Sequence, residues 1–255
     1  MEPNNNRPQI VGIPGAIIIA ATIIAIALVY IFHPVAPISK TAPVLSPNSP
    51  QVPQINMTPV TTADHILGNP NAQIKIVEFS DPSCPYCKMF NPTMEQVMNT
   101  YGPGGKVAWV YRSFPLDQPD PNGNILHPNA GHEAQALECA AFLGGNDKFW
   151  AYEKSWYETF PLQGATQRSV AEDTTQLVSL AKGVGLDTST FNDCLASGQF
   201  KSKIDAQYTD GINAGVSGTP HNIIIAPTGD KIPLVGAVSY ATMKTTLDTL
   251  LTEVK

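Results

Sequence analysis

The sequence predicts an α/β domain that follows a membrane-spanning helix. Beyond residue 61 the chain reads as strand, helix, strand, a long helical block, a β-hairpin and a final helix. Residues 10–32 form an apolar stretch without a charged side chain. Two cysteines, Cys84 and Cys87, stand at the start of the first predicted helix of the domain. The first two observations define the architecture, and the third locates its chemistry.

The composition favours one large acidic domain with a sizeable core. The chain has 255 residues, of which 43% are hydrophobic and 14% are charged, and its net charge is −6. A typical soluble domain carries about 25% charged residues. Proteins that bind nucleic acid usually show a basic patch, so the sequence predicts no nucleic acid partner.

Residues 1–9 form a short tail, and residues 10–32 (IVGIPGAIIIAATIIAIALVYIF) are predicted to be an uncleaved signal anchor. As a helix this stretch would be about 34 Å long, and the hydrocarbon core of a bilayer is about 30 Å thick. A cleaved signal peptide is the alternative, but its apolar region usually has only about 7–15 residues. We therefore expect a single-pass protein of the cell membrane with its domain on the extracytoplasmic side. Arg7 and Lys40 specify this orientation only weakly.

Residues 33–61 are predicted to be a linker. They contain seven prolines among serine, threonine, asparagine and glutamine. Such a composition cannot bury a core and favours an extended, polyproline-like chain. The linker would hold the following domain, residues 62–255, away from the membrane surface.

The domain begins with a strand rich in β-branched residues, which follows a Gly-Asn-Pro-Asn turn. In chain order the predicted elements are a strand at 73–80, a helix at 85–101, a strand at 106–112, helices within 129–199, a strand at 222–226, its hairpin partner at 231–235 and a helix at 239–254. Glycine and proline clusters at 144–145, 161–164 and 183–185 break the helical block. This order is that of a thioredoxin-like fold with a helical insert at about 127–200.

The cysteine pair is best explained as a redox-active dithiol. A zinc site of four cysteines usually has two Cys-x-x-Cys pairs, whereas Cys139 and Cys194 are single and far apart. A purely structural Cys84–Cys87 disulfide would close too small a loop to stabilise the fold much. The pattern therefore favours neither a metal nor a cofactor at this site.

The position of Cys84 predicts which sulfur reacts. If Pro85 opens the helix, Cys84 lies at the N-cap, where free N–H groups and the helix dipole favour its thiolate. We therefore expect the pKa of Cys84 to fall below the usual value of about 8.5. Cys84 would be the exposed sulfur that attacks or is attacked, and Cys87, one turn on, the shielded resolving sulfur.

At these cysteines the chain resembles a known family. The segment IVEFSDPSCPYCKMFNP resembles the active-site segment of membrane-anchored and secreted DsbA-like thiol–disulfide oxidoreductases. HEAQALECAAFLGGNDKFWAYEKSWYE is similar to the first inserted helices of that family, and FNDCLASGQF is similar to the last of them. GVSGTPHNIII is similar to its cis-proline loop and the strand after it. The resemblance covers roughly three quarters of the chain and implies a protein thiol–disulfide oxidoreductase.

The resemblance also implies roles for single residues. Pro220 would follow a cis peptide bond opposite the cysteines, and the Thr219 backbone would pair with a substrate peptide as an added strand. Glu78 stands where the family often keeps a buried acid, which can pass protons to the resolving thiol. The alternative is a solvated glutamate at the sheet edge. The expected substrate contacts are Pro85, Tyr86, Thr219 and His221.

Two positions depart from the family pattern. His221 and Asn222 follow the proline where an aromatic or aliphatic pair is commoner, which changes the expected lip of the site. Tyr86 stands where the periplasmic oxidase prototype has a histidine, and tyrosine holds a thiolate less well. Reduction potentials in this fold run from about −270 to about −120 mV. We expect an intermediate value, so the direction of the reaction stays open.

The sequence thus predicts a membrane-tethered oxidoreductase that introduces disulfides into exported proteins. By analogy with the family, a quinone-linked DsbB-like or vitamin-K-epoxide-reductase-like membrane protein would reoxidise it. A reductase or isomerase of the same fold is one alternative, and a non-catalytic binding module for cysteine-bearing partners is another. The redox potential separates the first two functions, and turnover separates an enzyme from a binder.

Cys139 and Cys194 are predicted to form a structural disulfide. Both lie in predicted helices of the insert with apolar neighbours at helical spacing, and an oxidising compartment permits the bond. Two buried free thiols are the alternative, because cysteine packs well as a small apolar residue.

Two histidines near the start of the insert, His127 and His132, carry no predicted chemistry. They flank a helix start. This position favours a surface or capping role over metal binding.

Overall fold

The computed structural model describes residues 55–119, 121–159 and 169–252. The predicted tail, the signal anchor and most of the linker lie outside these residues. Within them, no helix combines the length and the apolar character that crossing a membrane requires. The anchor therefore stays a prediction from the sequence.

A five-stranded mixed sheet forms the centre of the domain. Its strands are β1 (His65–Gly68), β2 (Ile74–Ser80), β3 (Val107–Ser113), β4 (His221–Ile225) and β5 (Lys231–Val235). The order across the sheet is β1-β3-β2-β4-β5, with β2 and β3 parallel and the other neighbouring pairs antiparallel. The central strand β2 is buried along almost its whole length, which explains its nearly continuous apolar sequence.

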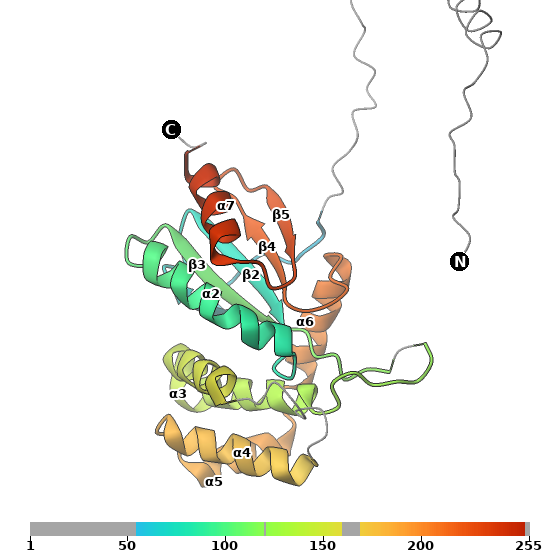
Figure 1. The fold of residues 1–255 in the computed structure, drawn as a ribbon. Coiled ribbons are helices and arrows are strands. Elements are labelled where there is room, and N and C mark those ends of the chain that lie inside the picture. Colours follow the sequence, from blue (N-terminus) through green and yellow to red (C-terminus); the bar gives the residue numbers. More distant parts are fainter. Residues whose placement is uncertain (1–54, 120, 160–168, 253–255) are drawn as a thin grey trace, which may run out of the picture. The chain divides into compact units, whose positions relative to one another are not determined.

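Helices cover both faces of this sheet. Helices α2 (Pro85–Tyr101) and α7 (Tyr240–Thr252) lie over one face (Figure 1), where their apolar side chains share a core with β2 and β3. Helix α6 (Lys201–Asn213) packs against β3 on the other face. At Gly211 of α6, an added Cβ atom would lie 2.6 Å from the Phe114 ring, so this close approach requires glycine.

The helical insert shares its core with the sheet. Its helices are α3 (Ala130–Thr159), α4 (Val170–Gly183) and α5 (Thr188–Ser197), which stack together beyond α2 (Figure 1). Helix α3 is interrupted at Gly145, where a φ of 76° lies in the left-handed region that favours glycine. The ring of Trp150 in α3 lies against Trp109 of β3, with centroids 4.7 Å apart. This contact packs the insert against the sheet beside β2, where Trp109 lies opposite Ile76.

A disulfide joins Cys139 of α3 to Cys194 of α5, which confirms the pairing expected from the sequence. Both cysteines are buried in the core that the insert shares with the sheet. The two residues are 55 positions apart in the chain. The bond therefore ties the first helix of the insert to its last.

Two elements, β1 and α6, were not predicted. Strand β1 has four residues, one of them glycine, so it is too short to show an alternating pattern. Helix α6 buries few residues of its own (Ile204, Asp210 and Gly211), so its apolar stripe is weak. Both elements are specified by what they pack against rather than by their own sequence.

The domain begins before residue 62. Met57 is only 4% exposed and belongs to the core beneath α6. The backbone N–H of Thr58 donates to Asp210 at 2.7 Å, and the Thr58 carbonyl accepts from Arg112 at 3.1 Å. Residues 55–61, which composition assigned to the linker, are therefore part of the domain, because one apolar anchor and a few hydrogen bonds hold them.

Candidate redox site

Cys84 stands between strand β2 and helix α2. It is the N-cap residue, with an extended backbone (φ −79°, ψ 121°), and Pro85 occupies the first helical position. Proline suits that position because its missing N–H needs no partner there. The Cys84 side chain makes no capping hydrogen bond as a thiol. Its sulfur therefore lies where free N–H groups of the first turn favour a negative charge.

The pKa of Cys84 is lowered from 9.0 to about 6. The largest cause is a hydrogen bond from the Cys87 thiol, which outweighs the opposing effect of burial. The backbone N–H of Cys87 lowers the pKa further, and the charge of Asp81 raises it. Cys84 is therefore mainly a thiolate at neutral pH, as expected for a reactive cysteine.

Cys84 is more covered than the sequence suggested. The residue is only 3% exposed, because the loop before β4 lies over it. The Cys84 thiol donates to the carbonyl oxygen of Thr219, and the two atoms are 3.4 Å apart. A reacting partner must therefore approach through the cleft that this sulfur lines.

Cys87 lies behind Cys84 and is fully buried. The backbone N–H of Asp81 donates to its sulfur at 3.5 Å. Burial raises the pKa of Cys87 well above 9.0, and the hydrogen bond and negative charge of Cys84 raise it further. Cys84 thus has the properties of an attacking thiolate, and Cys87 has those of a protonated, shielded resolving thiol.

We expect iodoacetamide to modify the reduced protein at Cys84 alone, with a midpoint near pH 6. The rate follows the thiolate fraction, which is large for Cys84 and negligible for Cys87 at neutral pH. Thiolate absorbance in the ultraviolet measures the titration of the thiol. Mass spectrometry of the labelled peptides shows which cysteine is modified. Equal modification of both cysteines at neutral pH would rule out this assignment.

Glu78 occupies the middle of the sheet on the face that carries α2. It is 2% exposed, so the buried acid, not the solvated glutamate, is what the structure contains. Its carboxylate accepts hydrogen bonds from Ser80 at 2.8 Å and from Trp109 at 3.0 Å. Burial raises the pKa of Glu78 to about 7 despite these bonds. Its charge in turn raises the pKa of Cys87, so the two groups interact, and proton transfer between them stays a prediction.

Replacing Glu78 with glutamine is expected to flatten the pH dependence of folding stability between about pH 4.5 and pH 7. The pKa of this carboxyl is raised on folding, so the native state binds more protons in that window and stability falls as pH rises. From pKa values of 4.5 and about 7, the loss in the wild type is about 3 kcal/mol. Urea unfolding of both proteins at several pH values measures it, and parallel pH profiles would contradict the prediction.

The loop that enters β4 lies opposite the cysteines. The Thr219–Pro220 peptide bond is cis, as the sequence predicted. The Thr219 carbonyl faces the Cys84 sulfur, and Thr219 also lines the cleft beside it. Pairing of this backbone with a substrate strand stays a prediction.

His221 and Asn222 point inward and do not form the lip expected from the sequence. They are 4% and 0% exposed, and their side-chain polar atoms have no hydrogen-bond partner among the described residues. Asn222 pairs with Glu78 across the sheet, and His221 pairs with Phe79, so the two side chains lie on opposite faces. Burial lowers the pKa of His221. Contact between His221 and a substrate stays a prediction that its buried position does not favour.

A cleft of about 880 Å³ opens beside Cys84. Exposed apolar side chains stand at its edge, with Tyr86 61%, Ile125 46% and Leu126 63% exposed. Pro85 and Thr219 also line the cleft beside Cys84. Such a surface suits an apolar segment of an unfolded polypeptide.

His127 also lines this cleft, although no chemistry was predicted for it from the sequence. It is 5% exposed, and its Nδ1 lies 2.7 Å from the carboxylate of Asp81, three residues before Cys84. The two residues are 46 positions apart, so no local pattern could pair them. The one available signal in the sequence was an acidic residue, Asp81, just before the cysteines.

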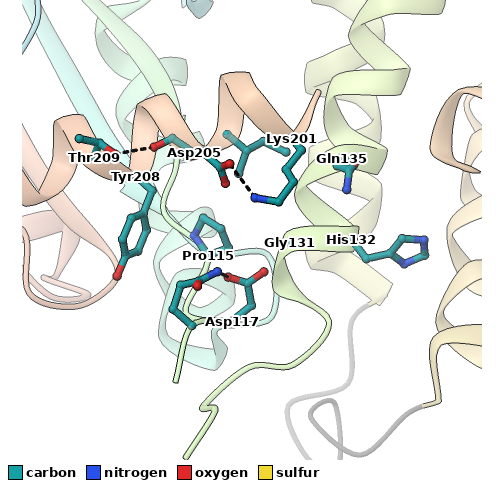
Figure 2. Close-up of a pocket in the computed structure, with 11 residues that line it drawn as sticks. Pro115, Asp117, Gly131, His132, Gln135, Lys201, Asp205, Tyr208 and Thr209 are labelled. Atoms are coloured by element: carbon teal, nitrogen blue, oxygen red, sulfur yellow. Dashed lines mark hydrogen bonds and ion pairs between the residues drawn. The ribbon is translucent and has the colours of Figure 1, made fainter. Parts of the chain in front are cut away.

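A second cavity, of about 410 Å³, lies between α3 and α6 and contains no cysteine (Figure 2). The ion pair of Lys201 and Asp205 stands at its wall. The imidazole of His132 points away from that ion pair, toward Asp173 at 3.0 Å. Among the residues that the structure describes, no group of three or more histidine, cysteine and acidic side chains is placed to hold a metal.

Comparisons with known proteins agree with this fold. Residues 60–249 match a family model described as thioredoxin. The crystal structure of oxidised BdbD from Bacillus subtilis is similar with a TM-score of 0.63 and 21% identity, covering 78% of this chain and 98% of that one. The thiol-disulfide exchange protein α-DsbA2 from Wolbachia pipientis is similar with a TM-score of 0.58 and 22% identity, covering 74% and 88%.

The curated relatives are longer proteins. Na(+)/H(+) antiporter NhaA 3 from Salinispora tropica is 31% identical over 158 residues, which are 62% of this chain and 21% of that protein. The chain spans 12% to 21% of the length of the first curated relatives that it matches. These relatives therefore support a shared segment rather than a shared activity.

A thioredoxin fold with a dithiol at the start of its first long helix defines the class of protein. The family model covers most of the chain, so the chain belongs to the thioredoxin family. The helices inserted between β3 and β4, and the likeness to BdbD and α-DsbA2, show the fold of the DsbA-like thiol–disulfide oxidoreductases within that family.

Proposed function

We propose that this protein is a membrane-tethered, extracytoplasmic thiol–disulfide oxidoreductase that introduces disulfides into exported proteins. One observation carries the proposal: the thiolate-favouring Cys84 lines an apolar cleft, while Cys87 lies buried and protonated behind it. Such an arrangement suits exchange with cysteines of an unfolded chain. The similarity to a solved thiol-disulfide exchange protein supports the same chemistry.

The reaction starts from the Cys84–Cys87 disulfide. A substrate thiolate attacks the Cys84 sulfur, the Cys84–Cys87 bond breaks, and Cys87 leaves and takes up a proton. A second substrate thiolate then attacks the substrate sulfur of the mixed disulfide and expels the Cys84 thiolate. The substrate loses two electrons, which the cysteine pair gains. Of the two protons released by the substrate, Cys87 holds one and solvent takes the other.

The oxidising direction follows from the stability of the leaving thiolate. A strongly stabilised thiolate stabilises the reduced form and makes the disulfide a stronger oxidant. The pKa of Cys84, about 6, lies three units below 9.0. This favours oxidation of substrates over reduction, although Tyr86 supplies no histidine within the Cys-x-x-Cys segment.

The cellular setting is proposed from sequence and chemistry together. The uncharged stretch at 10–32 supports tethering to the cell membrane, and the Cys139–Cys194 disulfide is typical of oxidising compartments. The reduced cysteine pair then needs an oxidant. A quinone-linked membrane protein of the DsbB-like or vitamin-K-epoxide-reductase-like kind would take up its two electrons.

The proposal is tested with the purified oxidised protein and a reduced, unfolded protein that folds through disulfides. We expect the substrate to gain native disulfides as Cys84 and Cys87 become reduced, and the reduction potential to lie above about −200 mV. Thiol trapping in cells should find the pair mainly oxidised. A potential near −270 mV with a reduced pair in cells would indicate a reductase. Binding of the substrate without exchange would indicate a binding module.

A further inference from the structure

His127 is held in a fixed position beside the redox site. Its backbone N–H donates to the Leu116 carbonyl at 3.0 Å, and its own carbonyl accepts from the backbone N–H of Ala130 at 3.1 Å. Its Nδ1 lies 2.7 Å from Oδ2 of Asp81. Hydrogen bonds of both its backbone and its side chain therefore hold His127 in place just before α3, at the end of the segment that connects β3 to α3.

Asp81 belongs to the turn that builds the Cys84 N-cap. Its carbonyl accepts from the Cys84 backbone N–H at 3.0 Å, and its Oδ1 accepts from the Ser83 backbone N–H at 2.7 Å. Its own N–H donates to the Cys87 sulfur at 3.5 Å. The carboxylate is wholly buried. Any charge placed next to Asp81 therefore acts on the cysteine pair at short range.

The negative charges of Asp81 and Cys84 repel each other, and a positive charge on His127 offsets this repulsion. The Asp81 carboxylate and the Cys84 thiolate are both negative, and the Asp81 charge raises the pKa of Cys84. Buried like charges at short range are costly unless a positive group compensates them. His127, which is positive when its imidazole is protonated, contacts Asp81 and lines the cleft with Cys84.

The protonation state of His127 is consistent with that role. Burial is the largest single effect and lowers the pKa of His127. The hydrogen bond and the charge of Asp81, together with the charge of the Cys84 thiolate, outweigh it, and the net shift is upward. Because interactions between two sites are reciprocal, a protonated His127 must favour the Cys84 thiolate by the same amount.

We propose that His127 is a positioning residue that compensates the charge of Asp81 and stabilises the Cys84 thiolate. It supplies, from the loop before α3, an imidazole that the Cys-x-x-Cys segment lacks because Tyr86 stands there. The inference deepens the proposed function, since a stabilised thiolate strengthens the disulfide as an oxidant. The stabilisation is present while His127 is protonated and is lost as pH rises through its pKa.

The first test replaces His127 with glutamine, which can still donate to Asp81 but carries no charge. We expect the pKa of Cys84, from thiolate absorbance, to rise by about half a unit to one unit, as the loss of a nearby charge predicts. The glutathione equilibrium should shift about three- to tenfold toward the disulfide, which corresponds to a potential lower by about 15–30 mV. An unchanged pKa in a folded H127Q protein would overturn the proposal.

His132→Gln is the matched control. His132 also pairs with a wholly buried carboxylate, that of Asp173, and it lies in the first turn of α3, the helix that follows the loop of His127. Its imidazole points toward that carboxylate and away from the Lys201–Asp205 ion pair (Figure 2), and His132 does not line the redox cleft. The variant should leave the pKa of Cys84 and the glutathione equilibrium unchanged. A shift equal to that of H127Q would assign both effects to general disturbance of α3 and would count against the proposal.

The second test needs no substitution at His127. Nuclear magnetic resonance titration of the histidine rings compares the reduced protein with the oxidised protein, and the H132Q spectrum helps assignment. By reciprocity, the pKa of His127 should be higher in the reduced protein by about half a unit to one unit. Equal values in the two redox states would overturn the proposal even if H127Q fails to fold.

Neither readout depends on a substrate. If the wild-type protein oxidises substrates but the pKa of His127 is the same in the reduced and oxidised proteins, the inference fails and the proposed function stands. If the pKa shifts appear but no substrate is oxidised, the inference stands and the proposed function fails.

Discussion

Replacing Cys84 with serine will abolish thiol–disulfide turnover, and replacing Cys87 with serine will trap mixed disulfides with substrates. Cys84 is the sulfur that lines the cleft, and its pKa of about 6 makes it the thiolate at neutral pH. A serine hydroxyl cannot form or break a disulfide. With Cys87 replaced, a Cys84–substrate bond loses the internal thiol that would otherwise release it. We expect rates below detection for C84S and substrate adducts that reductant reverses for C87S.

These two variants control each other because the substitution is the same at both sites. Non-reducing electrophoresis of protein purified from cells, followed by mass spectrometry, identifies the adducts. Both variants should keep the fold, since serine is smaller than cysteine and the Cys139–Cys194 bond remains. The assignment would be reversed if C84S, rather than C87S, accumulated the adducts. Substantial turnover by C84S would exclude a dithiol mechanism at this site.

The sequence predicted the parts of this site that local chemistry specifies. Pro85 and the apolar spacing after it were enough to place helix α2 at Pro85–Tyr101, with Cys84 at its N-cap. The Gly-Thr-Pro segment predicted the cis bond before Pro220 through its resemblance to a known loop. Each of these features lies within a few residues of the chemistry that it serves, so a pattern in the chain can indicate it.

What the sequence could not predict depends on contacts between distant segments. His127 was interpreted as a surface or capping residue, because nothing near it in the chain shows that Asp81 lies 2.7 Å away. His221 was expected at the lip of the site, but its place in the register of β4 buries it opposite Phe79. Strand direction and register decide which face a side chain occupies. A single sequence does not reveal which residues of neighbouring strands lie opposite each other.

The burial of Glu78 also depends on contacts between distant segments of the chain. Glu78 could be a buried acid or a solvated edge residue until its strand was placed between β3 and β4. The central place of β2 leaves its carboxylate with two protein donors, Ser80 and Trp109. Burial then raises the pKa of Glu78 to about 7. The place of β2 in the sheet, by burying this carboxyl group, therefore shifts its pKa away from the usual value for glutamate.

Replacing both Cys139 and Cys194 with alanine is expected to lower the free energy of unfolding by about 4 kcal/mol in the loop-closure model. The bond closes a loop of 55 residues between α3 and α5, which restricts the unfolded chain. Both side chains are buried, so the small cavities left by alanine add to the loss. For a domain of this size the midpoint of thermal unfolding should fall by about 8–16 °C.

The redox site should be affected far less than the stability. Cys84 and its N-cap are built by β2, α2 and the loop before β4, whereas the disulfide lies between α3 and α5 within the insert. The double variant should therefore keep the Cys84 pKa near 6 while it unfolds at lower urea concentration. Peptide mapping of the wild type should still show the Cys139–Cys194 link after mild reductant has opened Cys84–Cys87. Two alkylatable thiols at these positions in protein from its native compartment, or a loss of stability below about 1 kcal/mol, would show that the bond does not hold the insert together.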